Sequence, residues 1–533
     1  MKIHWLRLLG LGLALWMGAG AAQALTPADA LALVAGETDD RITTLNRLAT
    51  AADERASVLI QAMADESVRV VGERVLIVQG DGALDAVTGE RVAAVPEEAE
   101  DVMINNRLRS AMETALAGMQ LVGADAARQR EAASSLQRNA FDEPDASQLP
   151  LIDKALAADI DPQARQTLEL ARAAVLLASE DEAQRLQAAQ KLGEARQAIV
   201  RPLLLQRLET EESAPVQGAL KASLAALDRS LAISSALGQA FTGVSLGSIL
   251  LLAALGLAIT YGLMGVINMA HGELIMIGAY ATWLVQSFFR EALPQWFDWY
   301  LLVAMPLAFI ASALVGAAME RTVIRFLYGR PLETLLATWG ISLVLMQGVR
   351  SLFGAQNVGV ENPSWMSGGV TLMGNLSLPW NRIIIIGFAV AVLVGVTLLI
   401  GKTRLGLFVR GVTQNRPIAS CMGVNTARID TYAFALGSGI AGLAGCALSQ
   451  IGNVGPDLGQ NYIVDSFMVV VLGGVGQIAG TVYAALGLGI LNKFLEGWAG
   501  AVLAKIAVLV FIIVFIQKRP QGIFAMKGRS AEA

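Results

Sequence analysis

The stretch from Leu231 to Ala270 contains forty residues and no Asp, Glu, Lys or Arg. A single membrane-spanning helix needs only about 20 apolar residues, so one helix cannot accommodate this run. Two adjacent membrane segments are therefore predicted. They should meet near the sequence NMAHGE at residues 268–273, where polar side chains interrupt the apolar pattern.

The rest of the second half is also apolar. The chain has 533 residues, 54% of them hydrophobic and 16% charged, which is too apolar for a wholly soluble protein and long enough for at least two domains. We expect a mainly α-helical fold with about eight or nine spanning or re-entrant elements in residues 231–524. The further candidate spans are Tyr300–Met319, Leu332–Phe353, Ile383–Ile400, Tyr432–Ile451 and two or three passes in Val464–Gln517, where Gly473, Gly474, Gly476 and Gly480 are possible helix breaks.

Residues 1–24 have the pattern of a secretory signal peptide. A positively charged start precedes a short apolar stretch, and residues 22–24, AQA, have the small-x-small form of a cleavage site. The alternative is an uncleaved first membrane helix, for which Leu8–Met17 is short. Residues 25–230 should therefore lie outside the cytoplasm.

Residues 25–230 have the composition of a soluble, mainly helical domain. Val68–Val95 is rich in β-formers with Gly-Asp-Gly and Thr-Gly turn signals, which predicts a small hairpin or meander. Asp161 and Pro162 form a helix start, and Ala/Leu patterns recur around it. Paired helices stacked as a short HEAT-like solenoid are predicted, with a generic helical bundle as the alternative. No nucleophile and base stand out, which favours a protein-docking or spacer role.

The basic residues of the second half indicate its orientation. They are concentrated in residues 321–330, in residues 402–428 and from Lys518 onward, so these linkers and the tail 525–533 should be cytoplasmic. The linkers Gln286–Trp299 and Gly354–Trp380 are poor in Lys and Arg and should lie outside. This orientation agrees with an exported N-terminal domain.

The longest of the basic linkers, Gly401–Asp430, has the pattern of a helix that lies across the cytoplasmic face. Such a segment can dock into a groove on a partner protein. The alternative is an ordinary basic loop that only fixes the topology. The residues that we assign to this docking segment are Arg410, Asn415, Arg416, Pro417 and the turn residue Gly423.

Other function classes find no support in the sequence. Two cysteines and two histidines do not form a metal cluster of ordinary ligand number, and neither half has the basic clusters with aromatics that nucleic-acid binding needs. Residues 395–403, GVTLLIGKT, resemble a phosphate-binding loop but have five residues between the glycines and no preceding strand. We therefore expect no cofactor, and any ATP chemistry must belong to another chain.

Four motifs follow one another in the second half. They are YGLMGVINMAHGELIMIGAY (261–280), VRGVTQNRPIASCMGVNTARID (409–430), VVVLGGVGQIAGTVYAALGLG (469–489) and RPQGIF (519–524). Together they resemble the permease subunits of ABC importers of the branched-chain amino-acid type. Within that family, the long N-terminal extension makes the chain most similar to the urea permease branch.

The resemblance implies a permease subunit of an ATP-driven importer in the bacterial inner membrane, not an enzyme. Its implied partners are a periplasmic urea-binding protein, a second related permease, two ABC ATPase subunits at the docking segment, and membrane lipid. Urea is small and neutral, and the membrane half has few charges, which favours urea over a branched-chain amino acid or another amide. A passive urea channel and a membrane-anchored receptor are alternatives from other functional classes. Neither needs a docking segment, so this segment discriminates between them and the importer.

The polar stretch at residues 268–273 supplies the candidate translocation path or gate. A polar side chain at membrane depth usually faces the bundle or a water-filled cavity, and a buried imidazole is expected to stay neutral with one donor and one acceptor. If the stretch is helical, Asn268 and His271 share a face and Glu273 points elsewhere. Gly272 would let the neighbouring backbone approach closely. The alternative is that Asn268 and His271 only tie two helices together by hydrogen bonds.

Overall fold

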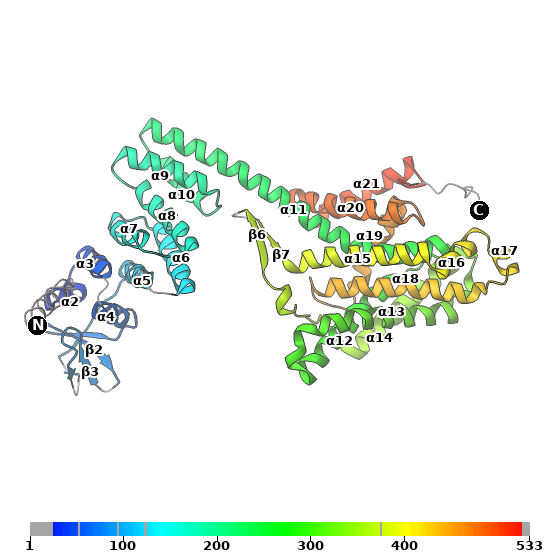
Figure 1. Ribbon diagram of the computed structural model, residues 1–533, viewed down its shortest axis with the longest axis horizontal. Helices are drawn as coiled ribbons and strands as arrows, with labels where there is room; N and C mark the ends of the chain where they lie inside the picture. Colours follow the sequence, from blue (N-terminus) through cyan, green and yellow to red (C-terminus); the bar gives the residue numbers. More distant parts are fainter. Residues whose placement is uncertain are drawn as a thin grey trace, which may run out of the picture. The chain divides into compact units, whose positions relative to one another are not determined.

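The computed structural model describes residues 25–524, apart from 52–53, 81, 93–94, 97, 122–124 and 374–375. The expected signal peptide, residues 1–24, and the expected tail, residues 525–533, lie outside the described residues. The chain divides into two compact units, Met1–Leu231 and Ala232–Ala533. Helix α11 (Ala214–Met264) contains residues of both units (Figure 1).

The first unit combines a small sheet with short helices. Its strands form an antiparallel meander in the order β4-β3-β2-β1-β5, as predicted for Val68–Val95. Turns at Gly72, Gly80 and Gly89 have positive φ angles, which glycine adopts without strain. The strands are β1 (Val68–Val71), β2 (Arg74–Gln79), β3 (Gly82–Asp85), β4 (Arg91–Val92) and β5 (Glu100–Asp101).

Amphipathic helices pack around one apolar core in this unit. Asp161 accepts hydrogen bonds from the amides of Gln163 and Ala164, and Pro162 occupies the first turn, so α8 begins where the sequence predicts. Leu136 of α6 and Leu168 of α8 are fully buried in the core. The helices are α2 (Pro27–Ala35), α3 (Thr38–Ala51), α4 (Glu54–Ala64), α5 (Asn106–Gln120), α6 (Ala126–Asp142), η1 (Ala146–Gln148), α7 (Leu149–Ala157), α8 (Pro162–Leu177), α9 (Glu182–Ala195) and α10 (Val200–Thr210). The HEAT-like arrangement stays a prediction.

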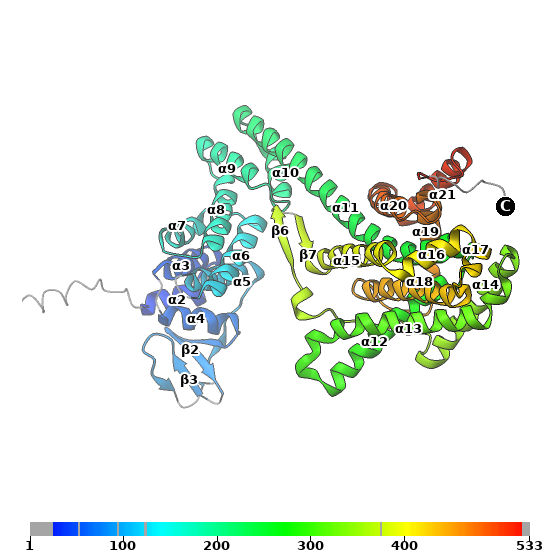
Figure 2. The same ribbon diagram turned by 45° about the vertical axis from the view of Figure 1, so that its right-hand side comes forward.

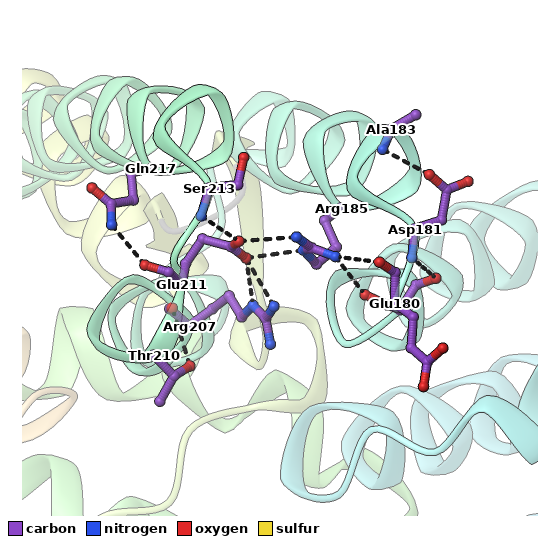
Figure 3. Close-up of polar contacts among 10 residues, drawn as sticks. Glu180, Asp181, Ala183, Arg185, Arg207, Thr210, Glu211, Ser213 and Gln217 are labelled. Atoms are coloured by element: carbon purple, nitrogen blue, oxygen red, sulfur yellow. Dashed lines mark hydrogen bonds and ion pairs between the residues drawn. The ribbon is translucent and has the colours of Figure 1, made fainter.

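A buried carboxylate holds the last three helices of the first unit together (Figure 3). Glu211 follows α10, and its carboxylate accepts hydrogen bonds from Arg185 of α9 at 3.0 Å and from Arg207 of α10 at 2.9 Å. The Ser213 amide donates to the same carboxylate at 3.1 Å, and Gln217 of α11 donates to the Glu211 carbonyl at 2.6 Å. Burial by itself would raise the pKa of Glu211, but the hydrogen bonds from Arg185, Ser213 and Arg207 outweigh it and lower the pKa to about 2.

The second unit is a bundle of apolar helices. Seven helices among the described residues are long and apolar enough to cross a membrane. Helices α12 and α19, of 22 and 16 residues, pack among them. The predicted run Val464–Gln517 becomes three helices, because α19 ends at Gly473 and Gly474 and Gly476 have positive φ angles.

The helices of the second unit agree with the predicted spans to within a few residues. After α11 they are α12 (His271–Ala292), η2 (Pro294–Trp299), α13 (Tyr300–Thr322), η3 (Ile324–Leu327), α14 (Pro331–Phe353), η4 (Ser364–Met366), α15 (Trp380–Lys402), α16 (Arg404–Gln414), α17 (Arg416–Cys421), α18 (Thr426–Ser449), α19 (Leu458–Gly473), α20 (Ile478–Ala499) and α21 (Ala501–Lys518). A hairpin of β6 (Gly369–Met373) and β7 (Leu376–Pro379) leads into α15 (Figure 2).

Helices α12, α13 and α18 form the centre of this bundle. A Cβ atom added to Gly445 of α18 would lie 1.9 Å from the Ile275 carbonyl oxygen of α12, so only glycine allows this approach. Ser312 of α13 donates to the Leu274 carbonyl of α12 at 2.8 Å. The outward faces of α14, α15 and α21 instead carry exposed Leu, Val and Ile side chains, as lipid-facing helices do.

Candidate functional site

The candidate site lies at the break between α11 and α12. Helix α11 ends at Met264, Gly265 has a φ of +66°, and α12 begins at His271. The predicted meeting of two segments at residues 268–273 is therefore confirmed. The condition for a shared face of Asn268 and His271, a helix through both residues, is not met, because the left-handed Gly265 follows the end of α11 and Asn268 lies in the connecting loop.

Contacts with three neighbours place the start of α12 at the middle of the bundle. The His271 Nε2 atom lies 2.9 Å from the Ala253 carbonyl of α11. A Cβ atom on Gly256 would lie 2.4 Å from the Gly437 carbonyl and 3.0 Å from the His271 ring, and Gly437 is near the middle of α18. Ser342, which contacts the first turn of α12, is near the middle of α14.

Helix α14 holds the loop of residues 265–270 in place. The Met269 amide donates to the Thr338 hydroxyl oxygen at 3.1 Å. Within the loop, the Asn268 Oδ1 atom accepts from the Ala270 amide at 3.0 Å. Thr338 was not predicted from the sequence, although Thr334, Thr338 and Ser342 recur every four residues in the otherwise apolar stretch 334–346 of α14, which is a signal for a polar stripe facing the bundle.

Three buried side chains at this break keep polar atoms that have no hydrogen-bond partner among the residues that the structure describes. Asn268 and His271 are 0% exposed and Glu273 is 1% exposed. The Ser342 hydroxyl donates to Glu273 Oε1 at 2.8 Å, whereas Glu273 Oε2, Asn268 Nδ2 and His271 Nδ1 are unpaired. His271 and Glu273 contact α11 and α14 respectively, so they point in different directions, as predicted.

The unpaired atoms define what this break can bind. The Ala253 carbonyl can only accept, so His271 Nε2 donates and Nδ1 of the neutral ring is an acceptor. The break thus offers one free amide donor on Asn268 and acceptors on His271 and Glu273. Buried polar groups without partners are rare and mark sites where a ligand or water binds. Because His271 and Glu273 point in different directions, these atoms are separate hydrogen-bonding groups along the break.

Gly272 has a different role from its neighbours. A Cβ atom at this position would lie 2.5 Å from the Gly459 carbonyl oxygen of α19. The glycine therefore allows close packing of α12 on α19, next to the unpaired polar atoms. In the described part of the chain, no group of three or more His, Cys, Asp or Glu side chains is placed to hold a metal ion.

The docking segment folds as the two short helices α16 and α17. Asn415 caps α17 by accepting from the Ile418 amide at 3.1 Å, Pro417 occupies the first turn, and Gly423 forms the turn to α18 with a φ of +83°. Arg410 donates to the Ile400 carbonyl at 3.0 Å. The helical prediction is confirmed, and docking onto a partner stays a prediction.

Comparison with known proteins gives a family match that lies within the second unit. The sequence profile described as the permease component of branched-chain amino acid transport systems matches residues 239–517. The high-affinity branched-chain amino acid transport system permease LivH of Salmonella typhimurium is 28% identical over 298 residues, covering 54% of this chain and 94% of the relative. BraD of Pseudomonas aeruginosa, with the same description, is 28% identical over 293 residues, covering 54% and 95%.

A relative with a lower coverage is a permease for a sugar. The ribose import permease RbsC of Escherichia coli is 27% identical over 205 residues, covering 37% of this chain and 61% of the relative. No solved structure matches the chain significantly. The residues matched by the family profile include both the α11–α12 break and the docking segment.

Proposed function

Because the chain belongs to the family of branched-chain amino acid transport system permease components, we propose that it is the membrane subunit of an ATP-driven ABC importer in the bacterial inner membrane. A permease component has no catalytic activity of its own. ATP hydrolysis is assigned to two separate ATPase subunits, and a second related permease completes the membrane part. A periplasmic binding protein delivers the substrate.

The observation that carries a transport role is the interrupted helix at mid-bundle. Discontinuous helices whose broken ends lie at the bilayer midplane are a recurring way for transporters to bind substrate. Asn268, His271 and Glu273 supply unpaired polar atoms at that depth, where unpaired groups are costly unless they serve a ligand. We therefore assign these residues to the translocation path or its gate, with Gly272 as a packing residue.

We assign urea as the substrate. Urea has a carbonyl acceptor that suits Asn268 Nδ2 and N–H donors that suit His271 Nδ1 or Glu273 Oε2, and because His271 and Glu273 point in different directions it would meet these groups one after another. The chain groups that contact His271 and Glu273 from α11 and α14 are the Ala253 carbonyl and the Ser342 hydroxyl, which carry no charge. A neutral amide thus finds complementary partners without needing a charged one.

A branched-chain amino acid, or another amide, is the second candidate. Two observations favour it: LivH and BraD are branched-chain amino acid permeases, and the start of α12, whose helix dipole is positive at the break, suits a carboxylate. Glu273 lies in that first turn and suits the ammonium group of an amino-acid zwitterion. The two candidates therefore differ in whether the substrate carries a pair of opposite charges to the break.

Uptake into proteoliposomes tests the function and the substrate together. The vesicles contain the complete importer, and labelled urea and labelled leucine are supplied with their binding proteins. We expect ATP-dependent urea uptake that His271→Phe abolishes while assembly and ATP hydrolysis persist. Uptake of urea without ATP would instead indicate a passive channel, and leucine uptake alone would assign the second candidate. Loss of assembly in His271→Phe would favour a purely structural role for His271.

Residues 25–230 are assigned to the periplasm, after a signal peptide at 1–24, with residues 231–524 in the membrane and 525–533 in the cytoplasm. The support is the charge distribution along the sequence, which places the basic linkers inside. The periplasmic domain would help to receive the binding protein. Cysteines introduced on exposed positions of this domain should react with a membrane-impermeant reagent in intact cells, and labelling only after lysis would contradict the assignment.

A further inference from the structure

A cluster of two buried carboxylates and two partly exposed guanidinium groups joins the docking segment to α13 and α18, and the proposed function does not use it. Its centre is Glu320 at the end of α13, which is 0% exposed. The carboxylate of Glu320 accepts from the Thr431 hydroxyl of α18 at 2.6 Å, from Arg325 of η3 at 3.2 Å and from the Tyr328 hydroxyl at 3.2 Å. One carboxylate therefore fixes the end of α13 to the start of α18.

The second half of the cluster holds the docking segment. Arg416, the first residue of α17, forms an ion pair with Asp430 of α18, which is 3% exposed. The same guanidinium lies over the Tyr328 ring, 4.9 Å from its centre. Tyr328 thus contacts Arg416 through its ring and Glu320 through its hydroxyl. The cluster therefore contains two carboxylates, of Glu320 and Asp430, and two guanidinium groups, of Arg325 and Arg416, so its charges are balanced.

Arg416 was predicted as a docking residue, and these contacts show that its partly exposed guanidinium group, with 42% of the side chain accessible, also pairs with a buried carboxylate of the same chain. A buried carboxylate is costly without a partner, so Asp430 needs Arg416 whether or not an ATPase is bound. Two partners on different elements fix the position of the guanidinium group. Arg416 therefore holds α17 to α18 and to the segment after α13.

The central helices connect this cluster to the α11–α12 break. Helix α18 contacts α12 where Gly445 meets Ile275, and α13 contacts α12 through the hydrogen bond from Ser312 to the Leu274 carbonyl. Leu274 is the residue next to Glu273. A displacement of α17 that is transmitted to α13 and α18 therefore reaches the backbone that carries the unpaired polar groups.

We propose that Arg416, through its ion pair with Asp430 and its contact with Tyr328, is a positioning residue that transmits movement of the α16–α17 segment to α13 and α18. This inference rests on the proposed function, because it assumes that the segment is moved by the ATPases. In this proposal, the guanidinium group of Arg416 serves the ion pair with Asp430 within the chain. Other residues of the α16–α17 segment contact the ATPases.

The test measures substrate taken up per ATP hydrolysed by the complete importer in proteoliposomes. Arg416→Glu should lower this ratio at least tenfold while ATP hydrolysis continues, and the exchange Arg416→Glu with Asp430→Arg should restore it to within about threefold of wild type. Arg321→Gln, which removes an exposed charge at the end of α13, is the matched control and should leave the ratio unchanged. A wild-type ratio in Arg416→Glu, or an assembled exchange variant that stays uncoupled, would overturn the proposal.

A second measurement reports on the contact without transport. Cys421, the last residue of α17, is exposed and Cys446 is buried, so a nitroxide label on the native chain reports on α17. Label mobility should rise in Arg416→Gln and return to the wild-type value in the exchange variant, and an unchanged mobility in Arg416→Gln would contradict the contact. If the wild-type importer itself shows no ATP-driven uptake, the proposed function fails, whereas this measurement still tests the contact.

Discussion

Replacing Glu211 by Gln should loosen the end of the first unit. The carboxylate is 1% exposed and pairs with Arg185 and Arg207, whose side chains are 12% and 27% exposed. A pKa of about 2 against the ordinary 4.5 corresponds to about 3 kcal/mol of stabilisation of the ionised form. Glu211→Gln keeps the shape but turns an amide group towards two guanidinium groups, so a loss of about 3 kcal/mol is expected.

Hydrogen exchange of the intact chain in detergent measures this loss locally. A loss of about 3 kcal/mol lowers the protection of amides in α9 and α10 roughly 100-fold at pH 7. The matched control is Asp228→Asn, which breaks the exposed pair of Arg201 and Asp228 and should change protection by less than about threefold. If Glu211→Gln changes protection no more than the control does, the carboxylate does not hold the helices together.

The same measurement has a defined dependence on pH. The folded pKa of Glu211 lies below the ordinary value, so its stabilisation is fully present above pH 4.5 and is lost as the pH falls towards 2. The difference in protection between the wild type and Glu211→Gln, corrected for chemical exchange rates, should shrink over that interval. A difference that is constant from pH 6 to pH 3 would refute the electrostatic explanation.

Apolar length and charge were enough to locate the membrane helices, but not all of their ends. The predicted span Leu332–Phe353 matches α14 closely. The predicted span Tyr432–Ile451 begins six residues after the observed start of α18 at Thr426. The charge of Asp430 argued against a helix buried there, because the sequence does not show that Arg416 neutralises it in the fold.

The sequence located the polar residues of the site but not their partners. Asn268, His271 and Glu273 stand out because the residues around them are apolar. Ala253 pairs with His271, Ser342 pairs with Glu273, and Thr338 pairs with the Met269 amide, and all three lie on other helices. Pairing between distant segments depends on packing that cannot be read from a single sequence. The condition for a shared face of Asn268 and His271 is not met, because Gly265 with its positive φ follows the end of α11.

Three further predictions concern packing and capping. Asp161→Ala removes the cap of α8 and should cost about 1 kcal/mol, measurable as faster hydrogen exchange in the first turn of that helix. Thr338→Val leaves the Met269 amide without its acceptor and should lower the melting temperature of the purified chain, corresponding to a loss of about 1–3 kcal/mol. Gly445→Leu should prevent assembly of the bundle, because even a Cβ atom there would lie 1.9 Å from a carbonyl oxygen of α12, and backbone cannot yield as a flexible side chain can. Gly487→Leu is its control, since a Cβ atom on that helical glycine meets nothing within 4 Å. Size-exclusion chromatography in detergent compares the two, and a monodisperse Gly445→Leu peak at the wild-type position would show that α12 and α18 do not pack as tightly as the glycine contact requires.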